Sequence, residues 1–530
     1  MDKSNLWVAR YTGIVMIATL VCRILGLGRE MVISNQFGAG IETDAFFIAF
    51  MIPNLLRSFI GEGALNTAFI PIFSECLTNQ DKKKADAFAS NVLNILIIIL
   101  VIIIIIGIWG APWIIKIVAG GFKQDPEKYL LTVRLTRIMF PYIAFAAIAA
   151  LFMGILNSYK QFFIPALAPA MLNIGIIWFA FLYGTKLGIY SLTIGVLIGG
   201  LAQVLIHIPS LWKGGFQYQL VLNFHNQKVK ELFQILIPAI IALAIDKINF
   251  VVDRVIASYL AHGSISALYY ANRLMQFPLG IFGIALSIAI LPTLSEYVAK
   301  KQIGKMKESF SFGIKLLSLF TLPSTVALLV LSYPVVRLFY EHGLFNPQDT
   351  DLTKVALICY TIGLYALALL RLVISTFYAL KDTKTPMKIG FLVVIFNIVL
   401  DLILVRYLGH AGIALATSLA AIVHLIMLSI ALQKKIKGLF TKELFTFFWK
   451  TGLACLLMGL FCWGVSQYFD FKFNMSLKIY QLNQVLISGI IGLMVYYFSG
   501  IMMGIPEFRN AKQIILNIIK IKTKEEDEND

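Results

Sequence analysis

Long apolar runs separated by short polar connections make up most of the chain. The run NVLNILIIILVIIIIIGIWG at 91–110 exceeds the roughly 18 uncharged residues that are typical of a membrane-spanning helix. Comparable runs recur along the sequence and predict fourteen spans. They lie near residues 11–36, 44–73, 88–112, 131–157, 162–184, 187–211, 232–260, 266–296, 308–335, 353–380, 386–406, 410–433, 444–468 and 482–504. The pattern predicts an all-α polytopic membrane protein with about fourteen transmembrane helices.

Composition and charge agree with this interpretation and give the chain a direction in the membrane. Of the 530 residues, 59% are apolar and 14% are charged, whereas a soluble protein has about 25% charged residues. The net charge of +17 does not indicate a nucleic-acid partner, because lysines concentrate in alternate connections such as 82–84, 300–307 and 381–388. This positive-inside pattern predicts that both termini are cytoplasmic. The excess positive charge also suits contact with anionic membrane lipids.

An internal duplication is visible in the sequence. PIFSE at 71–75 corresponds to PTLSE at 292–296, and Lys160 corresponds to Lys381, both at an offset of 221 positions. Each repeat contains six predicted spans, and because six is even both repeats start on the same side of the membrane. The repeats are therefore parallel rather than inverted.

The duplication predicts the organisation of the whole chain. Residues 1–225 and 226–438 each form a six-helix lobe, and the two lobes surround a central cavity, as in transporters whose substrate site lies between repeats near the midplane. Residues 439–507 contain two additional transmembrane helices, which we expect to pack against the second lobe and form an apolar groove. Residues 508–530 form a charged cytoplasmic tail.

Spans 1, 2, 7 and 8 contain a set of charged residues: Arg23, Arg29, Glu30, Arg57, Glu62, Asp253, Arg254 and Arg273. An arginine at the centre of a span costs roughly 2.5–3.5 kcal/mol, so several of them indicate a function. We expect four of the arginines to face one polar cavity that holds an anion: Arg23, Arg29, Arg57 and Arg273. The planar guanidinium group suits the oxygens of a diphosphate. The alternative is that Arg29–Glu30 and Arg57–Glu62 are ion pairs that hold helices together.

A second group of polar residues lies in the C-terminal half. Asn397 and Asp401 are one helical turn apart in span 11 and face the same way, and Asp253 and Thr417 complete a set of hard oxygen ligands. Such ligands suit a sodium ion rather than a transition metal, so the sequence predicts a sodium site and no other cofactor. The alternative is that Asp253 pairs with Arg254 while Asp401 lies in water near the outer surface.

Two segments resemble a known family. RILGLGREMVISNQFGAGIETDAFFIAFMIPNLLRSFIGEGALNTAFIPIFSE at 23–75 closely resembles the N-terminal signature of the MviN/MurJ family. YYANRLMQFPLGIFGIALSIAILPTLSE at 269–296 resembles its counterpart in the second half. This family comprises the bacterial lipid II flippases of the multidrug/oligosaccharidyl-lipid/polysaccharide exporter superfamily. The chain departs from the pattern at Asn272 and Gln276, where some relatives have acidic residues.

The resemblance implies a transporter of the bacterial cytoplasmic (inner) membrane and not an enzyme. The implied substrate is lipid II, the undecaprenyl-diphosphate-linked disaccharide pentapeptide used for peptidoglycan synthesis, and proteins of that synthesis are implied partners. Lipid II would move from the inner to the outer leaflet by alternating access. The family's important positions, implied here to bind substrate, fall on Arg23, Arg29, Arg57 and Arg273, together with Asp44 and Glu62.

Four other functions remain open at this point. A flippase for another polyprenyl-diphosphate oligosaccharide would need the same arginines, whereas a multidrug exporter of cations would need an acidic cavity. A membrane enzyme acting on the same lipid would need sizeable loops with acidic or metal-binding motifs, and the predicted loops are short. An inert membrane scaffold would leave the charges within the spans unexplained.

Overall fold

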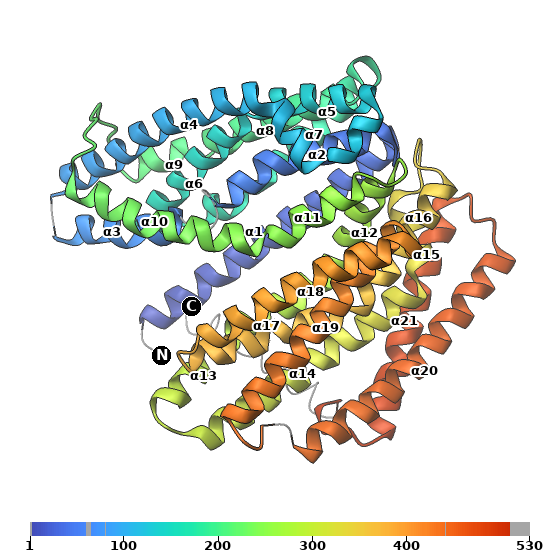
Figure 1. Cartoon of the computed structure of the whole chain (residues 1–530). Coiled ribbons are helices and arrows are strands. Elements are labelled where there is room, and N and C mark those ends of the chain that lie inside the picture. The colour runs from blue at the N-terminus through green and yellow to red at the C-terminus, as the bar shows by residue number, and fades with distance from the viewer. Residues whose placement is uncertain (1–2, 60–64, 80, 440, 509–530) are drawn as a thin grey trace, which may run out of the picture. The chain divides into compact units, whose positions relative to one another are not determined.

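The computed structural model describes residues 3–59, 65–79, 81–439 and 441–508, and every regular element in these ranges is a helix (Figure 1). The prediction of an all-α membrane protein is confirmed. Ten segments are long and apolar enough to cross a membrane. They are Lys82–Val118, Pro126–Ser158, Phe163–Leu187, Tyr190–Lys213, Ile303–Val330, Pro347–Ala379, Lys384–Leu408, His410–Lys435, Lys442–Lys472 and Lys478–Met502. Predicted spans 1, 2, 7 and 8, which contain the charged set, are not among these ten, so the count of fourteen stays a prediction.

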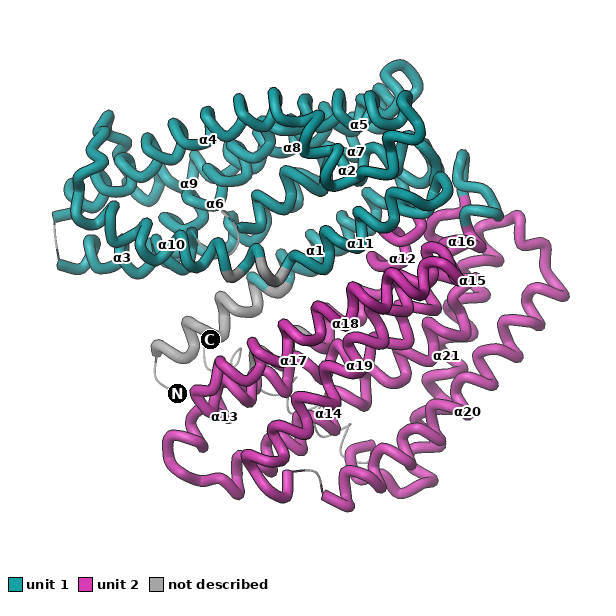
Figure 2. The backbone as a smooth tube through the Cα atoms, viewed as in Figure 1, with its two compact units in different colours: residues 1–266, 342–349 teal, residues 267–341, 350–530 magenta. Residues whose placement is uncertain are grey.

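The chain divides into two compact units, which are described separately (Figure 2). Unit 1 comprises residues 1–266 and 342–349, and unit 2 comprises residues 267–341 and 350–530. This division differs from the predicted lobe boundary at residue 225, because α10 (Gln227–Asp246) and α11 (Ile248–Ala257) belong to unit 1, where they pack on α3 and α4. The lobes at 1–225 and 226–438 were inferred from the repeat and stay a prediction.

Unit 1 contains twelve helical elements among the residues that the structure describes. In addition to α10 and α11 they are α1 (Lys3–Phe37), α2 (Ile41–Arg57), α3 (Leu65–Asn79), α4 (Lys82–Val118), the 3-10 helix η2 (Gly120–Gln124), α5 (Pro126–Met139), α6 (Tyr142–Ser158), α7 (Phe163–Leu187), α8 (Tyr190–Leu205) and α9 (Ile208–Lys213). Local sequence explains several of these ends. At the start of α5, for example, the side chain of Asp125 accepts a hydrogen bond from the backbone of Lys128, and Pro126 occupies the first turn, where its missing N–H has no cost.

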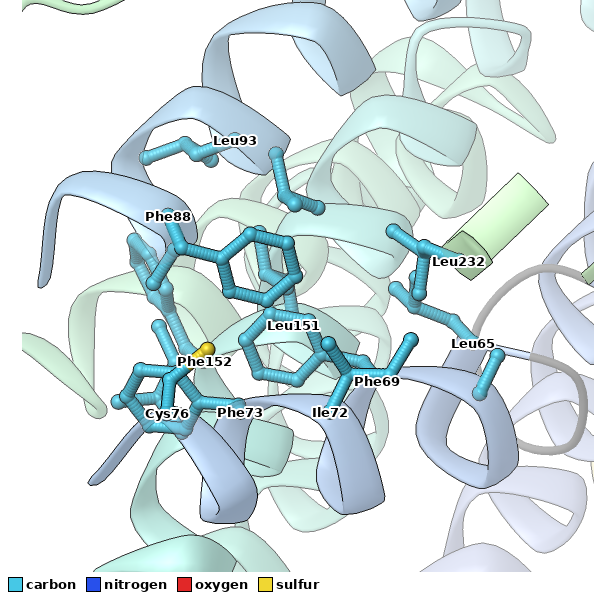
Figure 3. Packing of buried hydrophobic residues seen from close by; sticks show 14 of the residues in the cluster. Leu65, Phe69, Ile72, Phe73, Cys76, Phe88, Leu93, Leu151, Phe152 and Leu232 are labelled. Carbon is cyan, nitrogen blue, oxygen red and sulfur yellow. The ribbon is translucent and has the colours of Figure 1, made fainter. Parts of the chain in front are cut away.

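An aromatic core holds α3, α4, α6 and α10 together in unit 1. Phe69 stacks on Phe73 at a ring-centroid distance of 5.1 Å and on Phe88 at 5.8 Å. Leu232 of α10 lies in the same cluster, close to Leu65 (Figure 3). This shared core is the reason that α10 belongs to unit 1 although it follows the first repeat.

Helices α7 and α8 pack closely because glycines line their contact. A methyl group added at Gly175 would lie 2.6 Å from the Cα atom of Gly199 and 2.7 Å from the carbonyl oxygen of Gly195. Small residues that let two backbones approach are the usual basis of helix association within a membrane, where apolar side chains gain little from leaving lipid.

Unit 2 contains the remaining helical elements. They are α12 (Ser264–Pro278) and α16 (Pro347–Ile362), whose first residues belong to unit 1, together with the π-helix η3 (Leu279–Ile284), α13 (Ala285–Ala299), α14 (Ile303–Val330), α15 (Ser332–Tyr340), α17 (Leu364–Ala379), α18 (Lys384–Leu408), α19 (His410–Lys435), α20 (Lys442–Lys472) and α21 (Lys478–Met502). Helices α20 and α21 form a hairpin that packs against α14 and α15 (Figure 1). The two additional helices therefore lie against the second half of the chain.

The bounds of α7 and α18 recur at the offset seen in the sequence. Both ends of α18 lie 221 positions after those of α7. The lysine before each helix adopts a left-handed conformation, with φ of 61° at Lys160 and 59° at Lys381. The glycine after each helix does the same, with φ of 54° at Gly188 and 55° at Gly409. Matching helix lengths with matching ends support the internal duplication.

All five cysteines of the chain are free thiols. Cys76, Cys455 and Cys462 are buried, and Cys22 and Cys359 are half-buried. Each therefore contributes as a small apolar residue.

Candidate functional site

Arg29 is buried between α1 and α7 rather than directed into open space. It forms an ion pair with the adjacent Glu30, which is also buried, and donates a hydrogen bond of 3.2 Å to the side-chain oxygen of Asn173. Asn173 in turn donates to the carbonyl oxygen of Cys22, also at 3.2 Å. The Arg29–Glu30 pair lies within α1, and the contact that joins α1 to α7 is the hydrogen bond from Arg29 to Asn173, a partner that the sequence did not indicate. The predicted contact of Arg29 with substrate stays a prediction.

Arg57 lies at the last position of α2 and is half-buried. Its Nε donates to the side-chain oxygen of Asn54 at 3.0 Å. The residue lines a cavity of about 70 Å³ within unit 1, whose other walls are mainly alanines and prolines of α6 and α7. Gln203 and His207, both almost fully buried, also line this cavity. Arg57 thus lines a small pocket, and the described residues that line this pocket include no acidic side chain.

Two further predicted residues belong to the same region of the sequence. Arg23 is half-buried on α1. It lies six positions before Arg29, which on a straight helix turns the two side chains about 120° apart, and α1 continues through both without a break. Glu62 lies outside the described residues.

Asp44 is fully buried at the start of α2, and its carboxylate is satisfied by groups of unit 1. One oxygen accepts from the Lys128 ammonium at 2.9 Å and from the backbone N–H of Gly263 at 2.8 Å. The other accepts from the backbone and the hydroxyl of Ser266, at 2.8 and 2.7 Å. Four donors match the roughly four lone-pair sites of a carboxylate. The geometry gives Asp44 a structural role in joining α2 and α5 to the start of α12, and its predicted contact with substrate stays a prediction.

Arg273 is exposed on α12 in unit 2. Its guanidinium donates to the hydroxyl of Tyr269 at 3.0 Å and lies over the ring of that residue, 5.1 Å from its centroid. One turn away on the same helix, Gln276 donates to the side chain of Asn272. Because Arg273 belongs to unit 2 and the other three arginines belong to unit 1, the prediction that all four face one cavity stays a prediction.

The predicted sodium ligands are also distributed over the two units. In unit 2, Asn397 and Asp401 are both buried on α18, and the amide of Asn397 donates to the carboxylate of Asp401 at 2.8 Å. Thr417 of α19 donates to the carbonyl oxygen of Ile413. Asp253 belongs to unit 1, where its neighbour Arg254 donates to the carbonyl oxygen of Ile265. The expected contact of Asn397 with Asp401 is present, and burial of Asp401 argues against its alternative placement in water.

Chemically, the pair suits a cation only after a local change. A bound cation would need the amide oxygen of Asn397, whereas here the amide nitrogen faces Asp401. Which end of an asparagine amide faces a neighbour is assigned from such hydrogen bonds, so rotation of the amide by half a turn would present an oxygen. Among the described residues, no cluster of three or more histidine, cysteine, aspartate or glutamate residues suits a transition metal.

A large apolar cavity of about 600 Å³ lies in unit 2 where the α20–α21 hairpin meets α14. Its walls include Phe320 and Pro323 of α14, Met458 of α20, and Leu493 of α21. At one end, Lys315 and Glu507 form an ion pair of 2.9 Å, and Glu507 also lines the cavity. This cavity matches the apolar groove expected for the two additional helices.

Comparison with known proteins assigns the family. A family model described as lipid II flippase MurJ matches residues 33–482. The chain belongs to the MurJ family. A MurJ relative, the lipid II flippase MurJ of Burkholderia cenocepacia, is 34% identical over 454 residues, which cover 84% of this chain and 88% of the relative. The probable lipid II flippase MurJ of Buchnera aphidicola subsp. Schizaphis graminum is 34% identical over 501 residues, covering 92% of this chain and 96% of the relative.

Solved structures agree with membership of the MurJ family. A lipid II flippase MurJ in an inward closed conformation is 33% identical, has a TM-score of 0.77, and matches over 94% of this chain and 99% of its own. An inward-facing multidrug resistance MATE family transporter of the MOP superfamily has a TM-score of 0.64 at 15% identity, covering 80% of this chain and 99% of its own. The second likeness shows the fold alone. The resemblance inferred from the two sequence segments is confirmed.

Proposed function

We propose that this chain is a flippase that moves lipid II from the inner to the outer leaflet of the bacterial cytoplasmic membrane, with both of its termini in the cytoplasm. The observation that carries the proposal is the match to lipid II flippases over nearly the whole length of chain and relatives. The proposal makes the protein a transporter rather than an enzyme. Its product is used for peptidoglycan synthesis, and proteins of that synthesis are its expected partners.

The arginines are the proposed donors to the diphosphate. Arg273 is exposed and Arg23 and Arg57 are half-buried, so their guanidinium groups are accessible in a way that the buried Arg29 is not. A guanidinium group donates two parallel hydrogen bonds to a phosphate and keeps its charge at all physiological pH values. Arg29 then acts mainly by holding α1 against α7, which fixes the helix that also bears Arg23.

The apolar cavity beside the α20–α21 hairpin is the proposed site for part of the lipid tail. An undecaprenyl tail is far longer than this cavity and must remain in the membrane while the head group crosses. The cavity walls, which include Phe320, Met458 and Leu493, offer part of the tail an apolar surface. An apolar tail needs no hydrogen-bond partner there.

The membrane potential and a sodium ion are the proposed sources of direction. Outward movement of a diphosphate is favoured by an inside-negative potential by roughly 2.3 kcal/mol per charge per 100 mV. A charged carboxylate in a membrane-spanning helix is costly, and a sodium ion at Asp401, Asn397, Thr417 and Asp253 would neutralise the charge of Asp401. Such an ion biases transport only by binding one of two alternating-access states more tightly.

Reconstituted transport tests the proposal. Purified protein in liposomes should flip lipid II faster than a lipid-linked oligosaccharide with a different sugar head group, and an inside-negative potential should increase the rate. Arg273→Ala should abolish flipping, whereas Arg273→Lys should retain a part of it, because lysine keeps the charge and loses the paired donors. An absence of lipid II flipping by the wild type, or equal rates for Arg273→Ala and wild type, would contradict the proposal.

A sodium gradient tests the ion separately. The wild type should respond to the gradient, and Asp401→Asn should not, because an amide side chain cannot neutralise a bound cation. Thr383→Ser, a conservative change just outside the same helix, is the matched control and should respond like the wild type. A wild type that is indifferent to sodium would reduce Asn397 and Asp401 to a contact within α18.

A further inference from the structure

A polar network in unit 2 joins α15 to both helices of the α20–α21 hairpin. One guanidinium nitrogen of Arg337 on α15 donates to Asp470 of α20 at 2.8 Å and to the side-chain oxygen of Gln484 on α21 at 2.7 Å. The Arg337 side chain is about 10% exposed and Gln484 is fully buried, whereas the Asp470 side chain is 34% exposed. Three helices therefore meet at one largely buried cation, whose acidic partner lies at the edge of the network.

The network leaves Gln484 no alternative orientation. While its side-chain oxygen accepts from Arg337, its nitrogen lies 3.0 Å from acceptors on Ser466 and from the second carboxylate oxygen of Asp470. On the other side of the guanidinium, the ring of Tyr333 lies 5.1 Å from the central carbon of Arg337. A charged group held by an acid, an amide and an aromatic face is rigid, because each partner constrains a different direction.

The same short helix contacts α12, the helix that bears Arg273. Tyr340, one turn after Arg337, packs its ring on that of Tyr270 at a centroid distance of 4.8 Å. Its hydroxyl also lies 3.4 Å from the carbonyl oxygen of Tyr270. Tyr270 follows Tyr269, whose ring and hydroxyl hold the guanidinium of Arg273. Helix α15 thus links the arginine of α12 with the hairpin that borders the apolar cavity.

We propose that Arg337 is a positioning residue that keeps this cavity at a fixed place relative to Arg273, so that the tail and the diphosphate of one lipid are bound together. The inference rests on the proposed function and adds a role for a residue outside both binding surfaces. Without Arg337, the hairpin would lose its two bonds to α15, and Asp470 and Gln484 would be left without their shared donor. Arg273 would remain held by Tyr269.

The consequence is specific to the length of the tail. A lipid with a full undecaprenyl tail occupies both the apolar cavity and the surface at Arg273, and correct spacing of the two lowers its apparent KM. An analogue with a truncated farnesyl tail depends mainly on the head-group surface. Loosening the hairpin should therefore weaken binding of the long lipid and leave the short one nearly unchanged.

Initial flipping rates in proteoliposomes, measured against substrate concentration for both tails, test the inference. Arg337→Met should raise the apparent KM for undecaprenyl lipid II by roughly tenfold, within the range produced by misplacing a binding group by about 1 Å, and change the KM for the farnesyl analogue less than twofold. Asp470→Asn should shift the same way, and Arg337→Lys should recover part of the difference. Arg406→Met, at an exposed arginine near the end of α18, is the matched control and should leave both values unchanged.

The outcomes distinguish failure of the positioning role of Arg337 from failure of the proposed flippase function. Equal KM changes for both tails, or no change in Arg337→Met and Asp470→Asn, would overturn the positioning role while leaving the flippase itself intact. A wild type that flips neither lipid would instead overturn the proposed function. If Arg337→Met fails to fold, Asp470→Asn and Arg337→Lys, which preserve size and polarity, decide the question by the same comparison.

Discussion

Replacing Asp44 by asparagine probes the most completely satisfied charge that the structure describes in unit 1. Asp44 and Lys128 are both buried, with side chains 1% and 3% exposed. Loss of one partner of a buried ion pair costs about 3–5 kcal/mol, because the other charge remains without compensation. The amide adds a second penalty, since its nitrogen is a donor that must face either Lys128 and Gly263 or the two donors of Ser266. We expect Asp44→Asn to lower the free energy of unfolding by at least about 3 kcal/mol.

A double-mutant cycle with Lys128→Met isolates the pair. Lys128→Met leaves the buried Asp44 carboxylate without its cation, although three hydrogen bonds from Gly263 and Ser266 remain, and should also cost about 3–5 kcal/mol. The double variant should be more stable than the sum of the single effects, with a coupling energy of about 2 kcal/mol or more. Equilibrium unfolding in detergent gives the free energies, and faster hydrogen exchange at the amides of Gly263 and Ser266 in Asp44→Asn would locate the loss.

The result also distinguishes a structural Asp44 from one that touches substrate. A double variant that regains both stability and flipping would make Asp44 structural, as its four donors indicate. A double variant that regains stability without flipping would support the contact with substrate that the family motif implies. A cost below about 1 kcal/mol in Asp44→Asn would refute the reasoning from burial.

Two further changes have expected outcomes. Gly175→Ala should destabilise the protein by about 1–3 kcal/mol through overpacking, because its methyl group would meet Gly199 on α8. The control is Gly464→Ala, whose methyl group would have no atom within 4 Å and which should be neutral or stabilising. Thermal unfolding of the two variants compares their stabilities. In the connection before α18, the hydrogen bond from Lys435 holds the pKa of Asp382 well below its usual value. A carboxylate whose pKa is lowered in the folded state adds stability above its unfolded pKa of about 3.9, and this stability is lost as the pH falls through the folded pKa. The difference in unfolding free energy between wild type and Asp382→Asn should therefore be largest at neutral pH and should shrink below about pH 4.

Local patterns in the sequence were sufficient to predict an all-α membrane protein. Apolar runs such as 91–110 are long enough to cross a membrane and leave few alternatives to a spanning helix, and the structure contains that run within α4. The correspondence of Lys160 with Lys381 in the sequence agrees with the equal lengths of α7 and α18, because each lysine adopts a left-handed conformation just before its helix.

The site was less predictable, because its contacts join residues far apart in the chain. Asp44 meets Lys128 and Ser266, which lie 84 and 222 positions away, and no local period connects such residues. The sequence contains one weak signal for Arg337: it is the only lysine or arginine in residues 337–352, a predicted connection between spans. Its partners Asp470 and Gln484 belong to helices outside the duplication, so the repeat gave no guide to them.

The burial of three of the five native thiols leaves few natural cysteines to compete in chemical labelling. Cys76, Cys455 and Cys462 are at most 2% exposed, so a maleimide that does not cross membranes should react slowly with them, whereas the half-buried Cys22 and Cys359 would be replaced first. Gly40 and Gly304 have open space where a side chain would begin, and they lie in connections predicted to face opposite sides of the membrane. A single cysteine introduced at either position, with Cys22 and Cys359 replaced and the three buried cysteines kept, would then report its side in intact cells.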